Sequence, residues 1–137
     1  GISEVPLSQV FDGRLHLNRG EFLVQILVDK NVLNLPYTHV KKTKIEKIDY
    51  PLISMAAIKR QSLIAAAVSG ISDYPILLPS DALNNFGIRE NERINNVIDT
   101  VEGQVISDLS GSKEYRLFVL KNVLAQMYTN FNKEEPD

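Results

Sequence analysis

The clearest hydrophobic pattern in the chain lies in its last third and predicts a helix over residues 90–111. Apolar side chains recur there at steps of three and four, the spacing that places them on one face of an α-helix. They are Ile94, Ile98, Val101, Val105 and Leu109. Glu90 and Glu92 lie near the first turn, where the helix dipole favours carboxylates. Gly111 is a candidate for a left-handed stop.

A second helix is predicted to follow at once, with Ser112 as its N-cap. Its apolar stripe consists of Leu117, Leu120, Val123, Leu124, Met127, Tyr128 and Phe131. Burial of each such side chain contributes roughly 1.5–3 kcal/mol. Because the link between the two helices is short, we expect an antiparallel helical hairpin.

The middle of the chain predicts another helix and a short one after it. Residues 51–69 are rich in alanine, begin with Pro51, and are followed by Gly70, which can end a helix. We expect this helix to pack inward through Ile53, Ala57, Ile64, Ala67 and Val68. Residues 72–79 are expected to form a linker, after which Ser80 caps a short helix over residues 81–86.

The segment Glu21–Val28 fits two patterns. Alternation predicts a strand through Phe22, Val24, Ile26 and Val28. A helical patch is formed instead by Phe22, Leu23, Ile26 and Leu27. Asn18 and Glu21 have the spacing of a capping box, whereas the β-branched residues favour the strand. Both interpretations stay open, and Arg14–Leu17 is expected to be a short strand.

These elements predict an α+β fold in a single domain, residues 1–137. A mixed half with short strands covers residues 1–75, and a helical half covers residues 76–137, with a frayed tail at 132–137. At 137 residues, the chain is long enough to bury a real core.

Composition narrows the function classes only slightly. The net charge is −2 and cysteine is absent, so disulfides, thiolate catalysis and zinc–sulfur sites are excluded. No run of 18 apolar residues occurs, and we therefore expect no membrane partner. A cytoplasmic or virion location is compatible with this composition.

No motif for catalysis, metal or cofactor is visible. The glycines form neither a dinucleotide-binding fingerprint nor a phosphate loop. His16 and His39 are the two histidines, and neither has a nucleophile or an orienting acid at a suggestive spacing. We therefore predict no catalytic residue, no metal ligand and no cofactor, and expect a protein that is not an enzyme.

The densest charged feature is a lysine run formed by Lys41, Lys42, Lys44 and Lys47. Tyr37 and His39 lie just before it. The run is a candidate contact for nucleic-acid phosphates or for an acidic partner, and an adjacent aromatic ring could stack on a base. The other interpretation is a solvated edge strand or loop, because lysines commonly protect exposed strand edges.

Two further residues are candidates for partner docking. Gly103 lies within the predicted helix, where glycine costs about 1 kcal/mol relative to alanine. It could admit the close approach of a partner, pack against the chain's own helix, or simply be tolerated. Tyr128 lies near the end of the last helix, where its ring is either part of the core or exposed to a partner.

The second half also resembles a known family. The residues LLPSDALNNFGIRENERINNVIDTVEGQVISDLSG, followed by YRLFVLKNVLAQMYTNFNKEE, look like the head–tail connector proteins of tailed phages, of the adaptor or head-completion type. The resemblance covers residues 76–135. It implies a ring-forming structural protein between portal and tail, a homo-oligomer without a catalytic site. The lysine run would then face DNA or an acidic neighbouring ring.

The sequence therefore predicts a non-enzymatic structural or assembly protein that acts through protein–protein contacts, with a protein partner or a homo-oligomer. A nucleic-acid-binding accessory or regulatory protein that uses the lysine run is the alternative. Concentration-dependent assembly would favour the first hypothesis, and binding that weakens with salt would favour the second.

Overall fold

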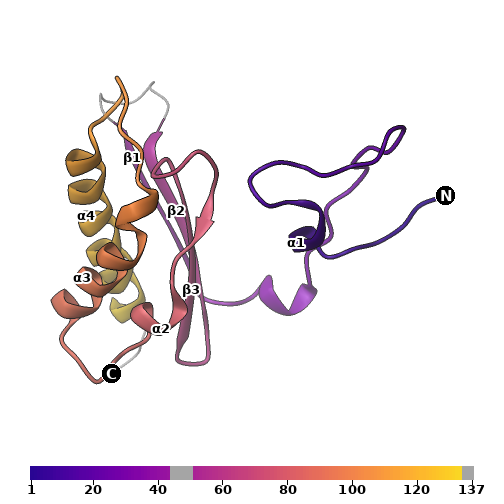
Figure 1. Cartoon of the computed structure of the whole chain (residues 1–137). Coiled ribbons are helices and arrows are strands. Elements are labelled where there is room, and N and C mark those ends of the chain that lie inside the picture. The colour runs from indigo at the N-terminus through magenta and orange to yellow at the C-terminus, as the bar shows by residue number, and fades with distance from the viewer. Residues whose placement is uncertain (44–50, 134–137) are drawn as a thin grey trace. The chain divides into compact units, whose positions relative to one another are not determined.

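The computed structural model describes residues 1–43 and 51–133. They form two compact units, Gly1–Asn34 and Leu35–Asp137, which we treat separately (Figure 1). Unit 1 includes a helical turn, α1 (Leu7–Val10), and a 3-10 turn, η1 (Lys30–Val32). Unit 2 contains the sheet and the longer helices.

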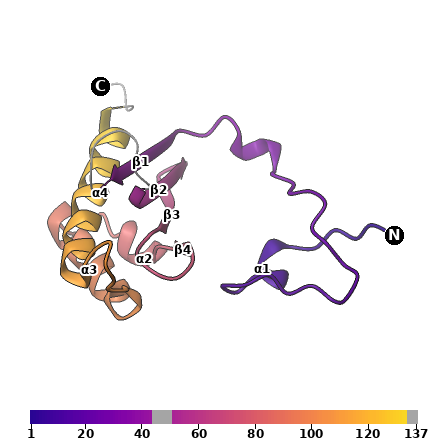
Figure 2. The same cartoon turned by 90° about the horizontal axis from the view of Figure 1, so that it is seen from above.

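Unit 2 combines an antiparallel sheet with helices that cover one of its faces (Figure 2). The strands lie side by side in chain order: β1 (Tyr37–Thr43), β2 (Pro51–Arg60), β3 (Leu63–Ser69) and β4 (Ile76–Leu77). The helices are α2 (Ser80–Leu83), α3 (Glu90–Val101) and α4 (Lys113–Lys133). The predicted α+β class, with strands before a helical C-terminal part, is confirmed.

The helix predicted over residues 51–69 is wrong, because this segment forms the hairpin of β2 and β3. Ile53, Ala57, Ile64 and Val68 are buried as predicted, but by alternation along two strands. Ala67 lies on the opposite face and is half-buried. The turn is hard to recognise because Gln61, which has a φ of 56°, stands where hairpins usually carry Asn-Gly or Asp-Gly.

Residues 21–28 form neither the strand nor the helix that their patterns predict. The Asn18–Glu21 pair does exist, since the Asn18 N–H donates to Glu21 Oε2 at 2.8 Å. That bond, with the Asn18 side chain, holds the pKa of the Glu21 carboxyl below its usual value. The pair closes a turn, however, and no helix follows. Of the predicted strand Arg14–Leu17, a single bridge between Phe11 and Leu15 is present.

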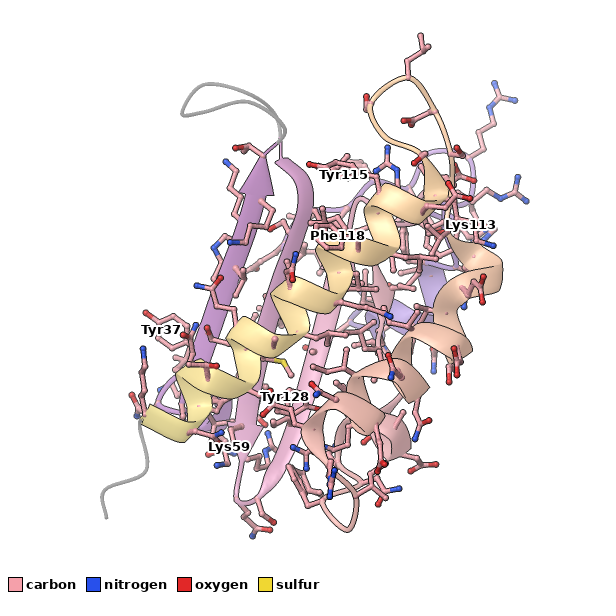
Figure 3. The ribbon with its side chains drawn as sticks, turned by 90° about the vertical axis from the view of Figure 1, so that its left-hand side faces the viewer. Tyr37, Lys59, Lys113, Tyr115, Phe118 and Tyr128 are labelled. Atoms are coloured by element: carbon pink, nitrogen blue, oxygen red, sulfur yellow. The ribbon has the colours of Figure 1, made fainter. Side chains whose placement is uncertain are left out.

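The core lies between the sheet and α4, which crosses the strands (Figure 3). Leu120, Leu124 and Met127 on α4 have no exposed surface, and Ile53 and Met55 on β2 are equally buried. The predicted stripe of this helix is thus confirmed, with Leu117 at its half-buried margin. At the far end of α4, the Asn130 amide donates to the Thr38 hydroxyl of β1 at 2.7 Å.

The first helix of the predicted hairpin ends earlier than expected, at Val101, and continues as the 3-10 turn η2 (Glu102–Gln104). The chain then leaves the helical path, because the Ile106 N–H donates to the carbonyl of Ile71 at 2.9 Å. Leu109 is consequently fully exposed and is not part of the stripe. Gly111 lies in the following turn and ends no helix.

Arg116 joins this connection to the sheet. Its side chain is 3% exposed and donates to the backbone carbonyls of Gly111 and Gly70. It also donates to Asp108 Oδ1 at 2.7 Å. This hydrogen bond is the main reason why the pKa of the Asp108 carboxyl lies below its usual value. A buried guanidinium needs such partners, because an unpaired charge in the interior is costly.

The predicted Ser80 cap and the bounds 81–86 of the short helix are wrong, because α2 covers Ser80–Leu83 and begins without a side-chain cap. Two other helix ends are held by side-chain hydrogen bonds. Ser112 caps α4 as predicted, since its hydroxyl accepts from the Tyr115 N–H at 3.2 Å. Asn84 ends α2 and pairs with the backbone of Ile64 on β3. Its amide donates to the Ile64 carbonyl at 2.9 Å and accepts from the Ile64 N–H at 2.7 Å. The amide side chain thus fixes α2 against the edge of β3.

Gly70 and Gly103 provide a matched pair for testing this fold. Gly70 has a φ of +93°, and a Cβ there would overlap the backbone carbonyl of Leu52. We expect Gly70→Ala to lower the free energy of unfolding by about 2 kcal/mol or more. A Cβ at Gly103 meets open space, so Gly103→Ala should change the free energy of unfolding by less than about 1 kcal/mol. Urea denaturation measures both, and equal effects would contradict the structure.

Candidate functional site

The lysine run divides between described and undescribed residues. Lys41 and Lys42 lie on β1, and both are exposed. β1 is an edge strand of the sheet, as one of the two predicted alternatives has it. Lys44 and Lys47 lie outside the described residues. Because neighbouring residues of a strand point to opposite faces, Lys41 and Lys42 belong to two different surfaces.

Lys41 belongs to the face of the sheet that the helices leave uncovered. Residues that pair directly across strands share a face. The register places the pair Arg60–Leu63 at the β2–β3 end of this face and defines three further rows on it. They are Tyr37–Ile58–Ala65, His39–Ala56–Ala67–Leu77 and Lys41–Ser54–Ser69. We call these ten residues the open face. The alternate rows, such as Val40–Met55–Val68, are buried beneath α4.

The open face is unusually apolar for an uncovered sheet. Antiparallel sheets with one solvated face normally carry polar residues there. Here the middle holds Ala56, Ala65 and Ala67, and Tyr37 and Leu77 stand at the sides with 71% and 77% of their surface exposed. Small side chains in the centre leave a flat surface between larger ones.

Among these ten residues charge lies on the β1 side, and Arg60 adds a cation at the β2–β3 end of the same sheet face. Lys41 is a basic residue, whereas none of the ten residues is acidic. His39 lies next to it, and its Nε2 is 2.9 Å from the hydroxyl of Ser54 on β2. The surface therefore combines a neutral apolar centre with a basic margin.

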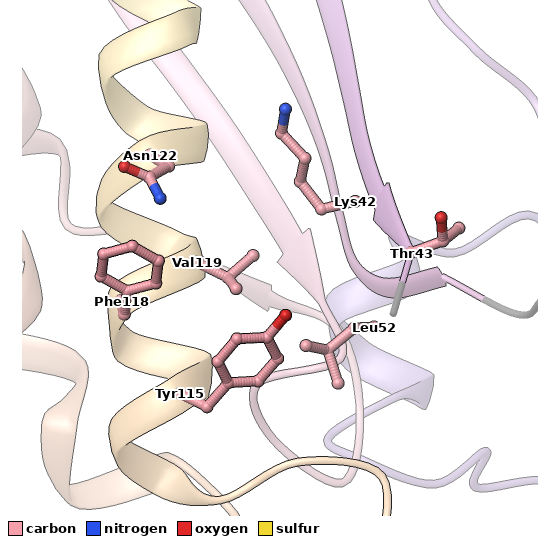
Figure 4. Close-up of a pocket in the computed structure, with 7 residues that line it drawn as sticks. All are labelled: Lys42, Thr43, Leu52, Tyr115, Phe118, Val119 and Asn122. Carbon is pink, nitrogen blue, oxygen red and sulfur yellow. The ribbon is translucent and has the colours of Figure 1, made fainter. Parts of the chain in front are cut away.

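Lys42 lines a groove on the other side of β1, between that strand and α4 (Figure 4). The groove has a volume of about 290 Å³. The ring of Tyr115 lies beside Leu52, and Phe118 stands at the rim with 60% of its surface exposed. Leu52, Phe118 and Val119 are apolar members of the groove, and Lys42, Thr43 and Asn122 are polar ones.

The structure separates the two predicted docking residues. Tyr128 is 2% exposed, and its hydroxyl donates to the Leu83 carbonyl at 2.6 Å. It therefore belongs to the core, and its ring is not available to a partner in this fold. Gly103 lies in η2 with open space around it, so packing against the chain's own helix is excluded as its role.

The two histidines belong to different units. His16 belongs to unit 1, where its Nε2 is 2.5 Å from Asp12 Oδ1, and both side chains are exposed. Within the described residues, no three His, Cys, Asp or Glu side chains are grouped so that they could hold a metal ion. Over residues 1–43 and 51–133, no helix is both long and apolar enough to cross a bilayer.

Sequence reasoning missed the open face because it assigned residues 51–69 to a helix. Large and small residues alternate only over Ile53–Ala56, because Ile64 and Val68 enclose three consecutive alanines. Alanine obscured the strand pattern, because this residue favours helices intrinsically and strands only through context.

The comparisons with known proteins add no family. No protein-family model matches the chain, and a search of curated proteins gives no match. Membership of the phage connector family thus stays a prediction.

Tyr128 gives a direct test of whether this residue supports the core. We expect Tyr128→Phe to lower the free energy of unfolding by about 1–3 kcal/mol, because the Leu83 carbonyl loses its buried donor. Tyr115→Phe is the control. Its ring is 41% exposed, and we expect an effect below about 0.5 kcal/mol. Equal stabilities of the two variants in urea denaturation would contradict a stabilising bond between Tyr128 and the Leu83 carbonyl.

Proposed function

We propose that this chain is an interaction module that docks through its open face on an apolar protein surface carrying acidic groups at one margin. The docking surface belongs to a separate protein or to another domain of the same polypeptide. In this proposal the domain works by contact and not by catalysis. The observation that carries it is the apolar, uncovered sheet face of Ala56, Ala65 and Ala67.

The shape of the open face suits a flat partner. Two sheet surfaces pack at a separation of about 10 Å when side chains of ordinary size interdigitate. The central alanines allow a similar or closer approach, and Tyr37, Ile58 and Leu77 surround them with larger apolar groups. Burial of such groups is the main favourable term in protein association. A sheet face that stays exposed to water would be expected to carry polar residues instead.

The charge of the face restricts the partner. Lys41 and its neighbour His39 form a basic margin that has no acidic counterpart on the open face. A partner surface that repeats this composition would add positive charge and supply no carboxylate. Electrostatic complementarity governs specificity and association rate more than affinity. We therefore favour a partner with Asp or Glu opposite Lys41 over a second copy of the same face.

Unit 1 gives independent support for a protein that works through contacts. Its own residues bury little, and large apolar side chains of residues 22–28 are exposed. They are Phe22, Leu23, Val24, Ile26, Leu27 and Val28. Contiguous exposed apolar groups of this kind are typical of interaction surfaces. A ring-forming connector would be one assembly of this type, and that assignment rests on the sequence resemblance.

Site-specific photo-crosslinking tests the proposal. A benzoylphenylalanine placed at Ala65, in the centre of the open face, is activated in the cells that produce the protein. The same group at the exposed residue Asn95 of α3 is the control. We expect a defined product from Ala65 alone, joined to an apolar peptide with Asp or Glu close by. A product within the same polypeptide identifies a neighbouring domain, and a product of higher mass identifies a separate protein.

A charge reversal then tests the contact with the identified surface. We expect Lys41→Glu to weaken binding about tenfold or more, because it places two carboxylates in opposition. Lys121→Glu, on the exposed side of α4, should leave the affinity unchanged. No product from Ala65 above the Asn95 control would contradict the proposal. A product formed solely with a second copy would replace it with self-association.

Nucleic-acid binding is the second candidate, favoured by one observation. Tyr37, His39 and Lys41 alternate along β1 and therefore stand in line on the open face. An exposed aromatic beside a cation is the arrangement that holds single strands by stacking and phosphate contact.

A salt titration with a single-stranded oligonucleotide distinguishes this candidate. If it is right, the logarithm of the affinity falls linearly with the logarithm of salt concentration, with a slope of about −0.7 for each phosphate contacted. Lys41→Gln should make that slope shallower, whereas Lys121→Gln should not. A titration that Lys41→Gln leaves unchanged would remove this candidate.

A further inference from the structure

A second cavity lies on the helix-covered side of the sheet, away from the open face. Its volume is about 240 Å³. The end of the β2–β3 hairpin contributes Lys59 and Ser62, and α4 contributes Asn132. Arg93 of α3 enters from the side. Figure 3 shows two lining residues, Tyr128 and Lys59, near the C-terminal half of α4. We call this space the Arg93 cavity.

The guanidinium of Arg93 is held in place by two aromatic rings. Its Cζ lies 4.7 Å from the centroid of the Phe86 ring and 4.8 Å from that of the Tyr128 ring. Tyr128 is itself fixed by its hydrogen bond to the Leu83 carbonyl. A guanidinium stacked on rings in this way keeps its planar set of donors in one orientation. Arg93 is therefore preorganised.

One donor of this group lacks a protein acceptor. The Nε of Arg93 is buried and has no hydrogen-bond partner among the described residues. A buried donor on a charged group is costly to leave unpaired. Burial is also the main cause that raises the pKa of the Tyr128 hydroxyl. Tyr128 consequently stays neutral at physiological pH and cannot balance the charge of Arg93.

The other polar groups around the cavity are also suited to an anion. Lys59 adds a second cation, Ser62 a hydroxyl donor and Asn132 an amide donor. No acidic side chain is among the described residues that line the cavity. Glu90 is the carboxylate whose charge acts on Tyr128 from nearby, and it does not line the space.

We propose that the Arg93 cavity binds the oxyanion group of a small organic acid, a carboxylate or a phosphate ester. Arg93 would hold the charge, with hydrogen bonds from Ser62 and Asn132. Ile64 and Phe131 line the same cavity and offer an apolar wall to the body of the ligand. Typical sites for drug-sized ligands measure about 300–1,000 Å³, so the ligand is compact.

Binding of four probe molecules to the full chain tests this site, with two-dimensional NMR as the readout. Benzoate and phenyl phosphate carry the two oxyanions on the same ring, inorganic phosphate lacks the ring, and benzyl alcohol lacks the charge. We expect saturable shifts of Arg93, Ser62 and Asn132 with the first two probes. Whichever of these two probes binds more tightly shows whether the site prefers a carboxylate or a phosphate ester. Inorganic phosphate should bind more weakly, and benzyl alcohol should not saturate.

The affinity of substituted variants for the probes shows which residues contact the ligand. We expect Arg93→Gln to weaken binding of the better probe about tenfold or more, because hydrogen bonds to charged groups are the stronger ones. Asn132→Ala, at an exposed position that leaves the core intact, should weaken it severalfold. The Asn132→Ala variant still tests the site if Arg93→Gln unfolds the chain. Lys121→Gln, elsewhere on α4, is the control and should have no effect.

Three outcomes would overturn the proposal. They are the absence of saturable binding up to the solubility of both oxyanion probes, equal binding of benzyl alcohol and benzoate, and equal affinities of the Asn132→Ala and Lys121→Gln variants. None of them bears on the open face, which lies on the other side of the sheet.

Discussion

The structure of unit 2 depends on the burial of one sheet face beneath α4. Leu120, Leu124 and Met127 interlock there with Ile53 and Met55, and all five side chains are withdrawn from water. Burial of apolar surface is the dominant favourable term in folding, so this contact determines the positions of the other elements of unit 2. The Asn130–Thr38 hydrogen bond fixes one end of α4 over β1, and Arg116 fixes the other end to the loops. α3 and α2 complete the same layer.

Burial of this sheet face also determines which residues point outward on the opposite face. Because strand residues alternate between faces, covering Val40, Met55 and Val68 necessarily turns His39, Ala56 and Ala67 outward. A sheet whose second face remained in water would be expected to place polar residues there. The small apolar residues at these positions point to a second covering layer that is not part of the described helices. The interaction hypothesis follows from that imbalance.

Sequence patterns predicted those parts of the fold that depend on local periodicity. The stripe of α4 and the Ser112 cap were visible because each has a local signal, and an edge strand was one of two interpretations of the lysine run. The β2–β3 hairpin was not visible, since Ala56, Ala57 and Ala65–Ala67 fit a helix equally well and the turn at Gln61 lacks the usual glycine. The open face depends on the register between strands, and Arg93 meets its rings through tertiary contact. Neither follows from the order of residues alone.

Thiol labelling of neighbouring positions on β3 tests most directly whether one face is covered and the other free. The chain contains no cysteine, so Ala65→Cys and Ala66→Cys each introduce a single reporter. Ala65 is exposed on the open face, whereas Ala66 is 2% exposed beneath the helices. We expect the purified chain to react at position 65 nearly as fast as an unfolded peptide, and at position 66 only through unfolding. Similar rates at the two positions would contradict this expectation.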